Sequence, residues 1–206
     1  MAQHHMTFHP DQDRTGNHFN KKFAGGKVSV TSPQGRFSDS SLINGTTLLS
    51  AKAIGKQLFI FFDSAILRIH LGIYGKWGFS EFEELPEPKG QVRARFVRGN
   101  QLADLRGPTA CELLSKEQYQ QILARLGPDP LDPMADRARF VEKVARSSVT
   151  IGQLLMDQSV ISGIGNVYRA EFLFRANLNP HTPGKLVPKE IVEAIWDDAV
   201  SLMPLG

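Results

Sequence analysis

Hydrophobic and polar residues alternate along the first half of the chain in short runs that are typical of β-strands. Val28 and Val30 alternate with polar residues, and residues 58–62 and 66–71 are short runs rich in β-branched, aromatic and other apolar side chains, with Arg68 and His70 inside the second run. Residues 92–97 alternate between apolar and basic side chains. Segments that contain glycine and proline separate these runs. Several short strands at this spacing predict a β-sandwich or barrel.

The spacing of apolar residues changes to that of a helix near Ser115. Residues 117–126 predict a helix that ends at the sequence Gly127-Pro128-Asp129-Pro130. Four more segments beyond this turn have helical spacing: residues 136–147, 150–158, 165–176 and 188–203. The chain therefore predicts an α+β fold, with an N-terminal β-sandwich followed by a helical domain. We place the domains at residues 1–22 (an atypical leader), 23–126 (the sandwich) and 127–206 (the helical domain).

The first 20 residues are polar, lack periodicity and contain four histidines: His4, His5, His9 and His18. Histidines can form a metal site, but these spacings match no compact ligand motif. An unstructured leader is therefore the favoured interpretation.

Composition limits the classes of protein and the compartment. The 206 residues have a formal net charge of +3, a balance that permits a nucleic-acid partner without requiring one. The single cysteine, Cys111, excludes a disulfide within the chain and a cysteine-based zinc site. No secretory signal is recognisable, and the longest apolar run is far too short to span a membrane. We expect a cytoplasmic protein with no membrane partner.

A glycine-containing break separates two predicted helices in the second half of the chain. The break is Ser162-Gly163-Ile164-Gly165, and the second helix starts at Asn166. Free backbone N–H groups and the helix dipole attract an anion to a helix N-terminus, and the Asn166 side chain can add a donor. A DNA phosphate fits such a corner. The alternative is a helical hairpin with a glycine turn and nothing bound.

The same region resembles the helix–two-turn–helix signature of the formamidopyrimidine-DNA glycosylase/endonuclease VIII family. The matching residues are Asp157-Gln158, Gly163-Ile164-Gly165-Asn166, Tyr168, Glu171, Leu173-Phe174 and Pro180. The resemblance implies that Asn166, on a turn formed by Gly163 and Gly165, contacts a phosphate beside the lesion. It also implies that the partner is double-stranded DNA with a damaged base or an abasic site, bound by a monomer.

Four upstream segments extend this resemblance. Residues 125–131 are similar to the interdomain segment of endonuclease VIII-like members, in which the arginine corresponding to Arg125 contacts DNA. Residues 32–37 and 106–112 resemble the actinobacterial branch of these proteins. Residues 55–59 resemble the hairpin motif whose lysine, here Lys56, serves as a proton donor or a lesion-strand contact. Without the resemblance, an ordinary solvated hairpin lysine is the favoured interpretation of Lys56.

Residues 70–75 resemble the loop that fills the space left by a flipped-out base. Chemistry on a base requires its removal from the stack, and an apolar side chain can fill the gap. The resemblance assigns this role to Ile73 and Tyr74. Both residues could instead be ordinary hydrophobic residues at the end of a strand.

The chain departs from the family pattern near both ends. Family chemistry uses the amine of an N-terminal proline as the nucleophile and the next glutamate as its acid partner. Here Met1-Ala2-Gln3 takes their place, and no glutamate precedes Glu81. The sequence also predicts that the apolar N-terminal helix of the family is missing. The four-cysteine zinc finger of the family has no counterpart in the chain, so we expect no cofactor.

These departures leave three hypotheses. The first is an active glycosylase and abasic-site lyase, in which the amine of Ala2, or that of Lys56, substitutes for the proline. The second, which we favour, is a catalytically impaired base-excision-repair protein that still binds damaged DNA. The third is a non-enzymatic module that binds nucleic acid or protein. The resemblance to endonuclease VIII-like proteins implies oxidised pyrimidines as the lesion class.

Overall fold

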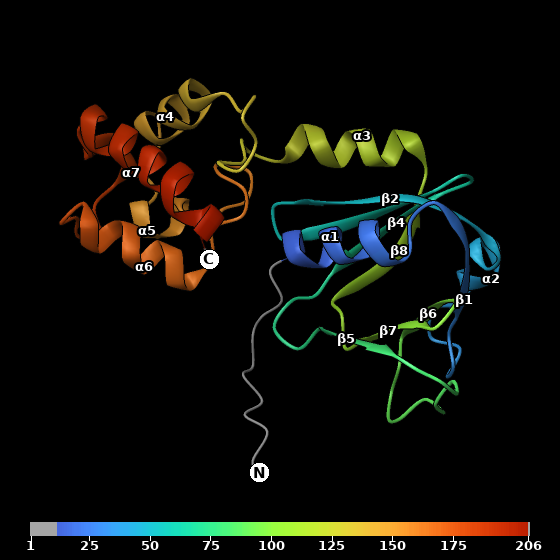
Figure 1. The fold of residues 1–206 in the computed structure, drawn as a ribbon. Helices are drawn as coiled ribbons and strands as arrows, with labels where there is room; N and C mark the ends of the chain where they lie inside the picture. Colours follow the sequence, from blue (N-terminus) through green and yellow to red (C-terminus); the bar gives the residue numbers. More distant parts are fainter. Residues whose placement is uncertain (1–11, 206) are drawn as a thin grey trace, which may run out of the picture. The chain divides into compact units, whose positions relative to one another are not determined.

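The computed structural model describes residues 12–205, which form an eight-stranded sheet and a set of helices (Figure 1). The strands are β1 (Gly26–Thr31), β2 (Thr46–Ile54), β3 (Gln57–Phe62), β4 (Ile66–His70), β5 (Lys76–Glu81), β6 (Ala94–Arg98), β7 (Gln101–Arg106) and β8 (Ala110–Leu114). The α-helices are α1 (Gln12–Lys22), α2 (Ser40–Ile43), α3 (Lys116–Arg125), α4 (Arg137–Ala145), α5 (Ile151–Leu154), α6 (Asn166–Arg175) and α7 (Lys189–Leu202). Two short 3-10 helices follow Pro183 and Leu202, namely η1 (Gly184–Leu186) and η2 (Met203–Leu205).

The chain divides into two compact units after Gln120, within α3. This division lies a few residues before the boundary that the proline-rich turn predicted. Each unit has its own hydrophobic core, and the two cores share no residue. The α+β class predicted from the sequence is confirmed.

The first unit is built around an antiparallel sheet in the order β5-β7-β6-β1-β2-β3-β4-β8. Strand β1 joins its two halves, because Gly26–Val28 pair with β2 whereas Ser29–Thr31 pair with β6. Side chains from both halves meet in one core, which contains Leu58 and Ile60 of β3 and Phe96 of β6. A strand that changes partners along its length is a common way to form a sandwich corner.

Helix α1 corrects the expectation of an unstructured leader and of a missing N-terminal helix. Phe19 and Phe23, one helical turn apart, are fully buried in the sheet core. The Asn20 side chain exchanges two hydrogen bonds with the backbone of Ala51 on β2, at 2.7 and 2.9 Å. The two buried phenylalanines and the hydrogen bonds of Asn20 therefore attach α1 to the sheet, although the other residues of this helix are mostly polar. Met1 to Asp11, including Ala2 and three of the four histidines, lie outside the described residues.

The second unit is a cluster of helices packed around aromatic residues. Phe140 of α4 and Trp196 of α7 are buried with their ring centroids 5.7 Å apart. Phe172 of α6 is fully buried and stacks on Tyr168. The apolar positions of these helices recur at helical spacing, as the sequence predicted.

The helix predicted over residues 150–158 is much shorter than expected. Helix α5 begins at Ile151, after an N-cap by the Thr150 side chain, and ends at Leu154. The chain then turns, and the Asp157 carboxylate accepts hydrogen bonds from the backbone and the hydroxyl of Ser159. Aspartate and serine favour such turns over a continuing helix, because their side chains hydrogen-bond the local backbone.

Candidate nucleic-acid interface

The corner at the start of α6 has the geometry that the sequence predicted. Gly163 has a φ of +97°, a region that glycine occupies without strain. Gly165 is the extended N-cap residue, and Asn166 is the first helical residue and is exposed. The first turn of α6 contains no acidic residue. This helix start therefore presents backbone N–H groups and an amide side chain to solvent, with the positive end of the helix dipole behind them.

Gln158 holds this turn in shape, a role that the sequence did not reveal. Its side-chain oxygen accepts a hydrogen bond from the Gly163 N–H at 2.8 Å. Its side-chain nitrogen donates to the carbonyl oxygens of Ile164 and Met156, each at 3.3 Å. One amide side chain thus satisfies three backbone groups of the turn. The signal in the sequence was the Asp157-Gln158 pair, which had been noted only as part of a motif.

The segment after α3 is fixed to the same turn. The Gly127 N–H donates to the Gln158 carbonyl oxygen at 2.8 Å, and the buried Ser162 hydroxyl donates to the Gly127 carbonyl oxygen at 3.0 Å. A Cβ atom on Gly127 would lie 2.5 Å from the carbonyl carbon of Val160, so only glycine fits. Arg125 is exposed two residues earlier, at the end of α3. The structure thus anchors the Arg125 segment to the turn that carries Asn166.

Arg169 is a further basic residue at the corner. Its guanidinium donates a hydrogen bond to the side-chain oxygen of Asn166 at 3.2 Å. The two residues are three positions apart on α6 and therefore lie on the same face of the helix. No carboxylate of the described residues forms an ion pair with Arg169. Its positive charge is therefore available beside Asn166, and the sequence analysis had not selected it.

The Asp157 carboxyl at this turn is stabilised as an anion. The Ser159 hydroxyl donates to it at 2.7 Å, and this hydrogen bond lowers the pKa of Asp157 below its ordinary value. Partial burial opposes the shift, and Lys143 supports it. The charged form therefore helps to hold the turn that leads to Gln158.

In the sheet unit, the predicted site residues gather at one end of three neighbouring strands. Lys56 lies in the β2–β3 turn, next to Gln57, and Gln57 pairs with His70 at the end of β4. The strand register therefore places Lys56 beside the loop that carries Ile73 and Tyr74. The pKa of His70 is lowered by burial, by Arg68 and by Lys56, which agrees with this proximity.

Ile73 and Tyr74 project into solvent from this loop. Their side chains are 79% and 84% exposed, so they are not packed in the core as ordinary strand-end residues would be. The loop is tight, because the Gly75 N–H donates to the Leu71 carbonyl oxygen at 2.9 Å and Gly72 has a φ of +65°. Their role as void-filling residues remains a prediction.

The structure adds three observations about metal ligands, the cysteine and membranes. Within residues 12–205, no group of three or more histidine, cysteine or acidic side chains is placed to hold a metal ion. Burial raises the pKa of the Cys111 thiol to about 12, so its thiolate is not readily formed. None of the helices in the described part of the chain is long and apolar enough to cross a membrane.

Comparison with known proteins agrees with this geometry. Residues 126–206 match the family model of the formamidopyrimidine-DNA glycosylase H2TH domain. The chain is 46% identical over 191 residues to Endonuclease 8 1 of Mycobacterium tuberculosis, which covers 90% of this chain and 71% of that relative. It is 30% identical over 161 residues to formamidopyrimidine-DNA glycosylase of Geobacillus kaustophilus, which covers 76% of this chain and 59% of that relative.

Solved structures show the same fold. The Lactococcus lactis Fpg in complex with DNA containing an abasic site superposes with a TM-score of 0.81. That match covers 95% of this chain and 76% of the other at 19% identity, so it speaks for the fold alone. The sequence relatives, the matched domain and the fold agree, and the chain belongs to the formamidopyrimidine-DNA glycosylase/endonuclease VIII family.

Proposed function

We propose that this chain binds double-stranded DNA that contains a damaged base or an abasic site, as a protein of base excision repair. The observation that carries the proposal is the corner at the start of α6, where Gln158 holds a turn that exposes Asn166 and the helix N-terminus. The 46% identity to a protein named Endonuclease 8 1 supports the same conclusion. Gly163 and Gly165 allow the backbone of this corner to approach a phosphate closely.

The chemistry of the corner suits a phosphate. Backbone N–H groups, the Asn166 amide and the Arg169 guanidinium are all hydrogen-bond donors. Arg125 supplies a second guanidinium from a segment that is anchored to the same turn. These groups bind phosphate without a metal, so we propose that DNA binding by the chain requires no cofactor. EDTA should leave the affinity unchanged.

We assign the sheet-end residues to the lesion. Lys56 lies beside the loop of Ile73 and Tyr74, and these two exposed apolar side chains can fill the space of a flipped-out base. The family resemblance gives Lys56 the role of a lesion-strand contact or proton donor. We further propose a monomeric, cytoplasmic protein that recognises oxidised pyrimidines.

DNA binding is tested by fluorescence anisotropy with a duplex that carries a stable abasic-site analogue, compared with the undamaged duplex. Asn166→Ala and Arg125→Ala should each weaken binding about tenfold. Arg125→Ala should also reduce the slope of log affinity against log salt by about one, because one charged phosphate contact is lost, whereas Asn166→Ala removes no charge and should leave the slope unchanged. Arg146→Gln, a change at an exposed arginine of the same unit, is the matched control. Equal affinities for wild type and both variants would contradict the site assignment.

Catalysis is tested separately, because we propose that the chain is catalytically impaired. A primary amine, from Ala2 after removal of Met1 or from Lys56, can condense with the aldehyde of an abasic site, releasing water and forming an imine. Borohydride reduces the imine to a stable amine and so traps the covalent complex. We expect at most a faint adduct. A strong adduct that disappears in Lys56→Gln would instead show an active lyase that uses this lysine.

A further inference from the structure

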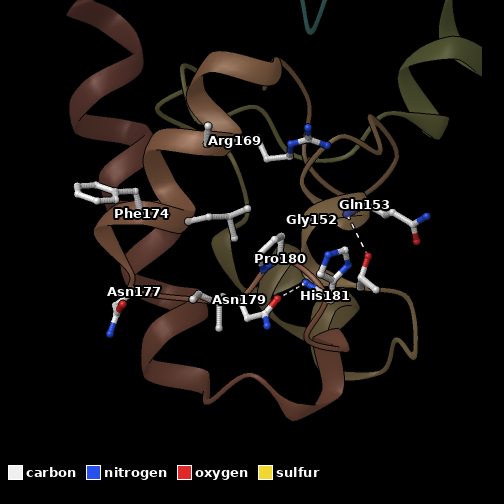
Figure 2. A pocket seen from close by; sticks show the side chains of 12 residues that line it. Gly152, Gln153, Arg169, Phe174, Asn177, Asn179, Pro180 and His181 are labelled. Carbon is white, nitrogen blue, oxygen red and sulfur yellow. Dashed lines mark hydrogen bonds between the residues drawn. The ribbon is translucent and has the colours of Figure 1, made fainter.

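A cavity of about 960 Å³ lies in the helical unit between α5, α6 and the loop that follows α6. Figure 2 shows Pro180 and His181 near the centre of the view, with Arg169 above them, Gln153 to the right, and Phe174 and Asn177 to the left. Its volume is in the range of about 300–1,000 Å³ that is usual for ligand sites. Most of these residues take no part in the proposed DNA contacts.

The cavity wall is a fixed structure. The N–H groups of Ile151 and Gly152 donate to the carbonyl oxygens of Thr182 and Pro180, at 2.8 and 3.0 Å. A Cβ atom on Gly152 would lie 3.0 Å from the Pro180 carbonyl oxygen, so glycine allows this close approach. Among the described residues, Asn177 is the one residue other than glycine that has a positive φ, at 49°. These contacts hold the loop against α5 before any ligand binds.

The lining combines apolar surface with positive charge. Leu173, Leu178 and Pro180 supply apolar surface, and Phe174 is 82% exposed at the rim. Arg169 is a fixed positive charge, and no lining residue is acidic. An occupant that matches this surface must offer both an anionic group and an apolar side chain.

We propose that this cavity binds a short segment of a partner protein that carries carboxylates next to an aromatic or aliphatic side chain. The carboxylate pairs with the Arg169 guanidinium, and the apolar side chain packs on Leu173 and Phe174. The backbone of duplex DNA satisfies only half of these requirements, because it offers phosphates but no apolar side chain. Phenylalanine and arginine are also enriched at protein interfaces relative to the rest of the protein surface. The proposal does not depend on the DNA contacts of Asn166, but it shares the Arg169 guanidinium with the phosphate site, so DNA and the partner segment compete for this residue.

The test begins with a phage library of random peptides selected on the full chain, with counter-selection on the double variant Arg169→Glu, Phe174→Asp. The most enriched peptide is then synthesised with a fluorescent label, and its affinity is measured by anisotropy. We expect acidic peptides with one or two large apolar residues. Arg169→Gln and Phe174→Ala should each weaken the peptide about tenfold, whereas Arg146→Gln should not. The changed residues are exposed or half-buried, and a thermal melt confirms that each variant folds.

Three results would overturn the proposal. The first is that no peptide is enriched on the full chain more strongly than on the double variant. The second is a selected peptide whose affinity is the same for wild type, Arg169→Gln and Phe174→Ala. The third is that a single-stranded oligonucleotide displaces the peptide and that binding of this oligonucleotide is lost in Phe174→Ala, which would make the cavity a nucleic-acid site.

Discussion

Gln12 occupies a buried position at the start of α1 although its side chain is polar. It is 8% exposed, and neither of its side-chain polar atoms has a hydrogen-bond partner in the described part of the chain. An unpaired buried amide costs about 1–3 kcal/mol. We therefore expect Gln12→Leu, which has a similar volume, to raise the free energy of unfolding by about that amount.

Urea unfolding measures this change. Gln120→Leu is the control, because Gln120 is exposed on α3 and its replacement should stay within about 0.5 kcal/mol. If Gln12→Leu lowers the stability, the amide of Gln12 makes a contact that favours the fold, and our account of this position is wrong.

His70 reports on the position of Lys56. Its pKa is lowered, first by burial and then by Arg68 and Lys56. Removal of one positive charge should raise the pKa of His70, so Lys56→Gln should shift its NMR titration to higher pH. Lys52→Gln, a change at an exposed lysine of β2, should not. An unchanged His70 titration in Lys56→Gln would mean that the hairpin lysine does not lie beside the Ile73 loop.

The lowered pKa of His70 also determines how this residue makes the stability of the fold depend on pH. The unfolded chain binds a proton on His70 more readily than the folded chain, because the folded pKa is the lower one. Stability is therefore unaffected at neutral pH and falls as the pH drops below the ordinary histidine value of about 6.5. His70→Asn should flatten this part of the curve of stability against pH.

Individual residues also show how far sequence reasoning reaches. Asn166 is exposed at the first position of α6, where the glycine turn predicted it, because local rules for helix ends determine that position. Arg95 behaves differently. It stands in a run that alternates basic and apolar residues, yet it is buried and its guanidinium donates hydrogen bonds to the Asp104 carboxylate at 2.8 and 3.0 Å. That pairing joins β6 to β7, and a contact between strands cannot be read from one strand alone.

At the scale of the elements, we expect the replacement of a glycine in helix α1 to increase stability. Gly16 lies in the middle of this helix, and a Cβ atom there would be 3.6 Å from Leu58 Cδ1, an ordinary contact distance. Glycine inside a helix is less stable than alanine by about 0.5–1 kcal/mol. Gly16→Ala should therefore stabilise the sheet unit by about this amount in urea unfolding. A loss of stability would show that α1 packs more closely on β2 and β3 than these distances indicate.

In the connection between α3 and the α6 turn, replacement of a glycine should lower the stability, in contrast to Gly16→Ala. A Cβ atom on Gly127 would overlap the backbone of Val160, which cannot move without disturbing the turn. Gly127→Ala should destabilise the helical unit by about 1–3 kcal/mol. It should also weaken DNA binding, because the Arg125 segment is displaced from the turn that carries Asn166. Normal DNA affinity in a folded Gly127→Ala variant would show that this anchoring is unimportant.

The elements differ in how well the sequence predicted them. Helices α3, α6 and α7 begin and end within a residue or two of the predicted ranges, because each has a continuous helical spacing and a clear stop signal. Helix α1 was missed because Gln12, Thr15 and Gly16 occupy its buried positions and conceal the apolar stripe. Helix α5 was predicted too long, since the turn at Asp157 and Gln158 depends on hydrogen bonds to residues that come later in the chain.

At the scale of the whole molecule, the two units have separate hydrophobic cores and one tryptophan each. Trp77 packs against the sheet core and Trp196 lies in the helical core, and the chain has no other tryptophan. The variants Trp77→Phe and Trp196→Phe therefore make fluorescence report on one unit at a time. Because no residue belongs to both cores, we expect each unit to respond to changes in its own core only.

Leu67 and Leu155 provide a matched pair for this test, since both are fully buried and each belongs to a different core. Replacement of a buried leucine by alanine costs about 2–5 kcal/mol. Leu67→Ala should lower the urea midpoint reported by Trp77 and leave that of Trp196 in place, and Leu155→Ala should do the reverse. If both midpoints move together in either variant, the chain unfolds as one cooperative structure, and the expectation that each unit responds only to its own core is wrong.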